Sequence, residues 1–463
     1  MKILSVRAIV VFLTIFINGV FSQAQDITGQ WYGALDIYEL RLVFHITQTD
    51  DGYTATWDSP DQNLTGMHVT TITFDGSKLS MAISDVYILY EGEYKTDSIV
   101  GTFKQAAVSF PLTLKRAPVE VKPIVRPQEP IPPFPYRSED ITFENKTDGI
   151  TLAGTLTLPE TGSNFTSVIL ITGSDPQNRD SELLGHKPFL VIADYLTRRG
   201  IAVLRYDDRG TAQSTGNFAR ATTADFATDA ESAIAYLKTR NEINPQKIGL
   251  VGHSEGGVIA PMIAARSEDV GFIVMLAGMG ISGDKLWLMQ LELLGRALGT
   301  SETELAVLKK IAEKVFDKIF TANGIVPYQE IFELLTTMKA DIVAALSEET
   351  TVDDFIRLFA ARINPWMQYF LRYDPAPTLE QVKCPVLAVN GSMDLQVPAK
   401  ENLTAIAEAL EKGGNKNVTI KEYPGLNHLF QECTTGSIDE YAIIEQTFSP
   451  EVLKDLGDWI LTH

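Results

Sequence analysis

Residues 247–257 constrain the fold of this chain more than any other segment. They begin as an apolar run typical of a buried strand, and residues 258–265 after them have the composition of a helix. Ser254 lies between Gly252 and Gly256, which lack the Cβ atoms that would clash where a strand and a helix pass close together. This pattern is typical of a nucleophile elbow, a sharp turn that exposes a serine hydroxyl.

The chain on both sides of this turn alternates between apolar runs and helical patterns. The predicted strands are 138–145, 150–158, 167–172, 201–206, 248–251, 272–277, 385–390 and 417–423. The predicted helices between and after them are 189–199, 223–240, 399–412 and 449–461. Strands that are apolar throughout and separated by helices indicate an α/β fold with a mostly parallel central sheet, covered on both faces, over residues 137–463.

Residues from about 279 to 377 interrupt this alternation. Their pattern is mostly helical, with predicted helices at 285–298, 303–320, 327–347 and 352–361. An insertion between two strands of the sheet is placed where a lid over the site would be. Near its end, Trp366 and Phe370 are candidate substrate-binding residues, because an aromatic surface suits an apolar acyl group or a ring. A place in the core of the lid is an equal alternative for both.

Residues 25–117 have a different pattern, with short runs of period-two alternation and turn signals such as Asp75-Gly76. They predict a small antiparallel all-β domain, either a barrel or a sandwich. Its aromatic residues Trp31, Tyr32 and Trp57 fit a core or rim better than a ligand groove. Residues 118–136 are rich in proline and predict an extended linker between the two domains.

Residues 1–24 have the pattern of a secretory signal peptide: a basic end, an apolar centre and small residues before a cleavage site after Ala24. We therefore expect a secreted or periplasmic protein without stable membrane insertion; a retained anchor is the alternative. The chain has 39 basic and 59 acidic residues, and a net charge of −20 argues against nucleic acid as a partner. The sequence contains no pattern for a metal or a cofactor, and it gives no oligomeric state.

An activated serine needs a base, and the base needs a carboxylate that orients it. His428 follows the last predicted strand, and Asp394 follows the strand 385–390. Both lie at the carboxyl edge of the sheet, where open α/β folds bind ligands. The chain order Ser254, Asp394, His428 therefore predicts a catalytic triad. The alternatives are a surface histidine and a helix-capping aspartate.

A tetrahedral oxyanion needs two hydrogen-bond donors. The backbone N–H of Glu255 is one candidate, and the backbone N–H of Ser174, in the loop after the strand 167–172, is the other. Asp207, Asp208 and Arg209 follow the next strand, and we expect them to brace loops near the site.

Residues 138–463 resemble the α/β-hydrolase superfamily, in the branch that groups serine aminopeptidase-like hydrolases with bacterial carboxylesterases. The resemblance rests on residues 172–174, 206–210, 252–257, 390–394 and 426–428. It implies the fold and the triad, and it says little about the substrate.

Three functions remain open from the sequence. The first is a carboxylesterase that cleaves a small-molecule ester through an acyl-enzyme on Ser254. The second is an aminopeptidase-type enzyme that acts on short peptides with the same triad and holds the free amine with carboxylates of the lid. Candidates for those carboxylates are Glu304, Glu330, Glu333 and Asp341. The third is a non-catalytic, carbohydrate-binding role of the β domain.

Overall fold

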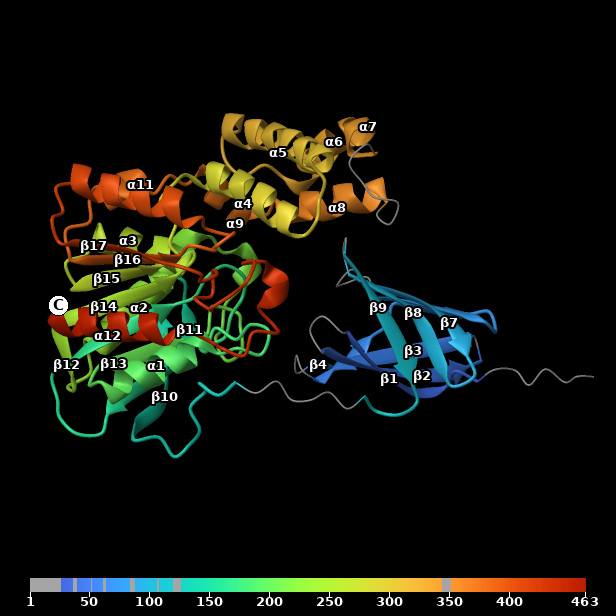
Figure 1. The fold of residues 1–463 in the computed structure, drawn as a ribbon, viewed down its shortest axis with the longest axis horizontal. Helices are drawn as coiled ribbons and strands as arrows, with labels where there is room; N and C mark the ends of the chain where they lie inside the picture. The colour runs from blue at the N-terminus through green and yellow to red at the C-terminus, as the bar shows by residue number, and fades with distance from the viewer. Residues whose placement is uncertain are drawn as a thin grey trace, which may run out of the picture. The chain divides into compact units, whose positions relative to one another are not determined.

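The computed structural model describes residues 26–35, 40–50, 52–60, 64–83, 88–105, 108–119, 126–343 and 351–463. The predicted signal peptide lies outside these residues. The described residues up to 119 form one compact unit, and those from 126 onward form a second (Figure 1).

The first unit is a single antiparallel sheet with the strand order β4-β3-β2-β1-β9-β8-β7-β6-β5. Its strands are β1 (Gly29–Leu35), β2 (Leu40–Thr49), β3 (Gly52–Ser59), β4 (Leu64–His68), β5 (Thr71–Phe74), β6 (Lys78–Ile83), β7 (Ile88–Lys95), β8 (Ser98–Gln105) and β9 (Val108–Lys115). Alternate residues face inward, so Trp31 and Trp57 are buried in the core, whereas Tyr32 is half-buried on the opposite face. The predicted antiparallel all-β domain is confirmed, and it has the form of a half-barrel.

The second unit contains a mixed sheet with the strand order β10-β11-β13-β12-β14-β15-β16-β17. Its strands are β10 (Tyr136–Asn145), β11 (Ile150–Pro159), β12 (Phe165–Ile171), β13 (Ala202–Tyr206), β14 (Ile243–His253), β15 (Phe272–Leu276), β16 (Val386–Gly391) and β17 (Val418–Tyr423). The pairs β10–β11 and β11–β13 are antiparallel, and all later pairs are parallel. The predicted α/β fold with a mostly parallel sheet is confirmed.

Helices cover both faces of this sheet (Figure 1). One face packs on α1 (Pro188–Arg198) and α12 (Pro450–Thr462). The other packs on α2 (Thr223–Leu237), α3 (Gly256–Ala264) and α11 (Ala399–Lys412). Alternation along β12 explains the two cores, because Val168 and Leu170 face the first layer while Ile169 and Ile171 face the second.

The predicted helical insertion lies between β15 and β16. It consists of α4 (Gly283–Ala297), α5 (Glu302–Thr321), α6 (Tyr328–Thr337), α7 (Lys339–Val343), α8 (Val352–Arg362), α9 (Pro365–Arg372) and α10 (Ala376–Leu379). It has an apolar core of its own, and α4, α5 and α8 lie together beyond one edge of the sheet in Figure 1. Among the described residues, none of the helices is both long and apolar enough to cross a bilayer.

The prediction of a single helix over 327–347 is wrong for the described residues, and 344–347 lie outside them. α6 ends at Thr337, and a separate short helix begins at Lys339. The hydroxyls of Thr336 and Thr337 donate to the carbonyls of Phe332 (2.8 Å) and Leu334 (2.6 Å). Such bonds compete with the regular helical ladder, and the backbone leaves the helix at the next residue.

Candidate active site

Ser254 occupies the sharp turn between β14 and α3. Its φ is 54°, a left-handed value that costs energy for a residue with a side chain. A Cβ on Gly252 would lie 1.9 Å from the carbonyl oxygen of Gly256, and one on Gly256 would lie 2.2 Å from that of Ile171. The backbone N–H of Ser254 also donates to the carbonyl of Leu276 at 2.9 Å. The turn therefore requires both glycines, and the sheet holds it in place.

His428 and Asp394 form a buried pair beside this turn. The Nδ1 atom of His428 lies 2.8 Å from Oδ2 of Asp394. The other oxygen of Asp394 accepts the backbone N–H groups of Gln396 and Val397, both at 2.8 Å. Because the carboxylate faces Nδ1, that nitrogen carries the proton and Nε2 is left as an acceptor. This is the tautomer that a general base needs.

One cavity of about 310 Å³ connects the predicted residues. Its lining includes Ser254, His428, Ser174, Glu255, Trp366 and Phe370. Asp394 lies behind His428 and does not line the cavity. The structure thus brings the predicted triad, both oxyanion candidates and both substrate-binding candidates to one place.

The loop that carries Ser174 is held at both of its ends. The Asp208 carboxyl accepts the Thr172 hydroxyl (2.6 Å) at one end and the Gln177 backbone N–H (2.9 Å) at the other. Asp207 accepts the backbone N–H of Arg179 (2.8 Å) and its guanidinium (2.7 Å). Burial raises the pKa of Asp208 to about 8, because the charged form has lost its water.

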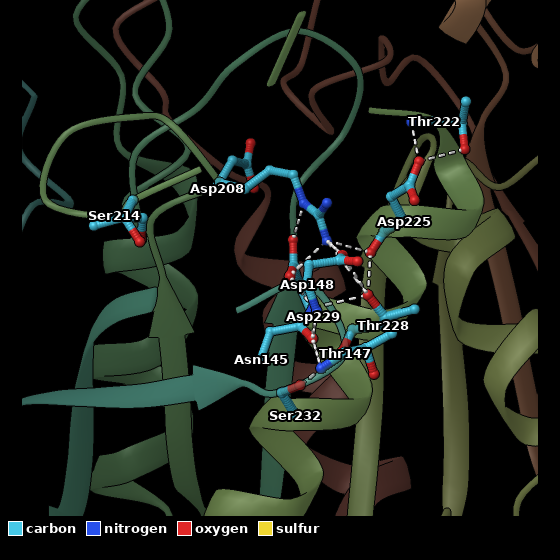
Figure 2. Close-up of polar contacts among 12 residues, drawn as sticks. Asn145, Thr147, Asp148, Asp208, Ser214, Thr222, Asp225, Thr228, Asp229 and Ser232 are labelled. Atoms are coloured by element: carbon cyan, nitrogen blue, oxygen red, sulfur yellow. Dashed lines mark hydrogen bonds and ion pairs between the residues drawn. The ribbon is translucent and has the colours of Figure 1, made fainter. Parts of the chain in front are cut away.

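Arg209 anchors the turn after β13 to helix α2. Its guanidinium lies 2.7 Å from one oxygen of Asp229 and 2.8 Å from Asp148. Asn145 donates to Asp229 (2.7 Å) and Thr228 (2.8 Å), and Figure 2 shows these side chains converging from β10 and α2. The three residues predicted to brace loops thus contact the loop at 172–179 and the helix beside it.

Two side-chain contacts next to Ser254 were not predicted from the sequence. The Nε2–H of His253 donates to the backbone carbonyl of His428 at 2.9 Å, although the sequence assigns His253 no role. Desolvation lowers its pKa to about 3, so the ring is neutral. The Glu255 carboxylate accepts hydrogen bonds from Thr223 (2.6 Å) and Trp366 (2.7 Å), and only its backbone had been considered. The only feature of the sequence that pointed to the side chains of His253 and Glu255 was their position next to Ser254.

The four lid carboxylates that an aminopeptidase would need do not line the cavity. Glu304 caps helix α5, and Glu333 accepts a hydrogen bond from Gln329. Glu330 and Asp341 pair with lysines, at 2.6 Å and 3.0 Å. The carboxylates that do line it are those of Asp175, Glu182 and Glu255. The described residues contain no group of three or more His, Cys, Asp or Glu side chains placed to hold a metal ion.

The chain is similar in sequence or fold to several known proteins. The model of the serine aminopeptidase S33 family matches residues 189–432. Esterase EstD of Thermotoga maritima is 26% identical over 385 residues, which are 81% of this chain and 81% of that protein. An uncharacterised 31.7 kDa protein of Escherichia coli is 27% identical over 271 residues, 58% of this chain and 84% of that protein. A solved esterase of Pyrococcus furiosus aligns with a TM-score of 0.42 and 16% identity, covering 71% of this chain and 93% of that one.

Proposed function

The chain belongs to the serine aminopeptidase S33 family and is a serine hydrolase, and from this premise we propose that it is a carboxylesterase. The observation that carries the proposal is the cavity that Ser254 shares with His428, whose lining is more apolar than polar. Its apolar lining includes Val258, Met279, Leu286, Trp287, Trp366 and Phe370. Such walls suit an uncharged ester with an apolar group. The similarity to an esterase of Thermotoga maritima supports the same reaction.

The proposed reaction passes through an acyl-enzyme. His428 Nε2 takes the proton of the Ser254 hydroxyl while Oγ attacks the ester carbonyl carbon. The backbone N–H groups of Ser174 and Glu255 stabilise the resulting oxyanion. His428 then gives its proton to the leaving alkoxide, the alcohol departs, and water attacks the acyl-enzyme in the same way. Asp394 stabilises the imidazolium that forms in each half.

An aminopeptidase activity on the same triad is the second candidate. The carboxylates of Asp175 and Glu182 line the cavity and favour it, because a free α-amine is a cation. In that case the specificity would come from the loops of the sheet domain rather than from the acidic residues of the insertion.

Turnover of two substrate series by the purified protein separates these candidates. We expect hydrolysis of p-nitrophenyl esters of graded chain length, little hydrolysis of aminoacyl p-nitroanilides, and loss of both in Ser254→Ala. Anilide hydrolysis without ester hydrolysis would support the peptidase. No turnover of either substrate, together with no labelling by a fluorophosphonate, would contradict both.

Export is part of the proposal, and it rests on the pattern of residues 1–24. N-terminal sequencing of the protein from the culture medium or periplasm of an expressing bacterium should find Gln25 first. An intact N-terminus on protein in the cytoplasm would contradict it.

A further inference from the structure

The side chain of Glu255 is a buried carboxylate on the nucleophile turn that no step of the proposed reaction uses. It is 7% exposed and lines the same cavity as Ser254. Within the part of the chain that the structure describes, it forms no ion pair with a lysine or arginine. A buried carboxylate without a cation is costly unless its oxygens accept hydrogen bonds, and burial accordingly raises the pKa of Glu255.

Two neutral donors from two helices hydrogen-bond to this carboxyl group. Thr223, the first residue of α2, donates its hydroxyl at 2.6 Å, and Trp366 of α9 donates its indole N–H at 2.7 Å. The Ser174 side chain acts to lower the pKa of this carboxyl. One side chain next to the nucleophile therefore joins the helical insertion to helix α2 of the sheet domain.

Trp366 forms part of the cavity wall. Its ring stacks on that of Phe370 with 5.7 Å between centroids and 17° between planes, and both rings line the cavity. Asn364 caps the helix that carries them by accepting the backbone N–H of Met367 at 2.8 Å. The indole N–H is the polar edge of this wall, and its acceptor is Glu255.

We propose that Glu255 is a positioning residue that fixes Trp366 as the wall on which the apolar group of the substrate packs, and thereby sets the selectivity for that group. This inference rests on the proposed esterase function. It assigns the Glu255 side chain a role distinct from the oxyanion role of its backbone. It also explains why a costly carboxylate lies beside the nucleophile: a wall held by a strong, short hydrogen bond presents a preformed surface to the substrate.

A double-mutant cycle tests the contact between the two residues. Glu255→Met keeps the length of the side chain and removes the acceptor, whereas Trp366→Phe keeps a ring and removes the donor. On p-nitrophenyl esters of increasing acyl length, each change should raise KM for the longest ester by about tenfold, roughly the upper value of one intramolecular hydrogen bond. The double variant should show about the same tenfold rise rather than a hundredfold one, because Trp366→Phe removes a contact that Glu255→Met has already removed.

Trp287→Phe is the matched control. Trp287 also lines the cavity, but its ring packs edge-on against Phe316 and Phe359. Its effect on KM should multiply with that of Glu255→Met. The indole N–H resonances in a ¹⁵N spectrum give a readout that does not depend on turnover: the Trp366 signal should shift in Glu255→Met and stay in place in Trp287→Phe.

Effects of Glu255→Met and Trp366→Phe that multiply in an active enzyme, or a Trp366 resonance that Glu255→Met leaves in place, would overturn this inference alone. A wild-type protein that hydrolyses no ester and takes no fluorophosphonate label would instead overturn the proposed function, and with it the selectivity role. The indole resonance would still decide whether the contact exists.

Discussion

At the scale of single residues, the pair of Asp394 and His428 carries the sharpest prediction. Asp394→Asn preserves the shape of the side chain, but its amide can present an N–H to Nδ1 of His428 and so favour the wrong tautomer. We expect kcat to fall by about 10³- to 10⁴-fold, while the unfolding temperature stays close to that of the wild type. Ester hydrolysis and calorimetry on the same preparations check this. A variant that keeps most of its activity would remove Asp394 from the triad.

The triad could be predicted from the sequence because it follows from local motifs in a fixed chain order. Each of its members follows a strand whose apolar run is recognisable, and strand ends of a parallel sheet meet at one edge. The hydrogen bonds of Glu255 and His253 could not be predicted, because their partners lie 111 and 175 residues away. Only the three-dimensional fold places Trp366 and His428 beside them.

At the scale of elements, the contact between the turn after β13 and helix α2 depends on one buried ion pair. The side chains of Arg209 and Asp229 are 7% and 2% exposed. Asp229→Ala leaves the guanidinium without its main partner, and we expect a loss of about 3 to 5 kcal/mol in the free energy of unfolding. Denaturant unfolding measures this loss. Because Arg209 directly follows Asp207 and Asp208, which hold the loop that carries Ser174, ester hydrolysis should fall as well.

The same helix offers a matched control. Glu231 of α2 pairs with Arg266 at 2.8 Å, but those side chains are 36% and 48% exposed. Glu231→Ala should cost less than about 1 kcal/mol, because water screens an exposed pair. Equal losses of unfolding free energy in the two variants would show that burial does not make the Arg209 pair more stabilising than the exposed pair.

Long helices were easier to predict than short ones. The periodic apolar pattern predicted α5, α8 and α11 to within a residue or two, because each has a long amphipathic face. α9 was not predicted as a helix, although its Asn-Pro start at 364–365 is a known capping signal. Its short length gave the periodicity too few turns to show.

At the scale of the whole molecule, the buried His186 predicts a dependence of stability on pH. Its ring contacts the Tyr441 carbonyl (2.8 Å) and the Thr447 hydroxyl (3.0 Å), and burial lowers its pKa to about 4. The unfolded chain binds a proton at this site below pH about 6.5, but the folded chain does so only below about 4. The contribution of His186 to the free energy of unfolding is therefore fully present above pH about 6.5 and is lost as the pH falls toward about 4.

Asp208 has the opposite effect on the pH dependence of stability. Its pKa of about 8 means that the folded state holds a proton that the unfolded state releases, so this residue favours the folded state more as the pH falls. The test is therefore a difference between proteins. Between pH 7 and pH 4.5, the stability of the wild type relative to His186→Asn should fall by about 2 to 3 kcal/mol, as measured by denaturant unfolding. A difference that does not change with pH would mean that His186 is not held neutral.

The last part of the predicted linker over 118–136 is in contact with the second unit from residue 126 onward. Arg126 donates to the carbonyl of Ala442 (2.8 Å) and to that of Leu184 (3.2 Å). Gln128 accepts the backbone N–H of Thr447 (2.7 Å) and donates to the carbonyl of Phe448 (2.6 Å). Proline content predicted an extended chain, but it carried no information about which side chains would find partners.

This contact predicts where the chain can be shortened. A protein that starts at Arg126 should keep the ester hydrolysis and the unfolding temperature of the catalytic unit. One that starts at Tyr136 should unfold several degrees lower, because each partly buried backbone group that loses its partner costs about 1 to 3 kcal/mol. It should also bind substrate less well, since Leu183, beside the carbonyl that Arg126 contacts, lines the cavity. The full-length double variant Arg126→Ala, Gln128→Ala should reproduce both losses without any truncation. Equal unfolding temperatures and equal ester hydrolysis of the two shortened proteins would show that residues 126–135 only connect the two units and do not stabilise the second one.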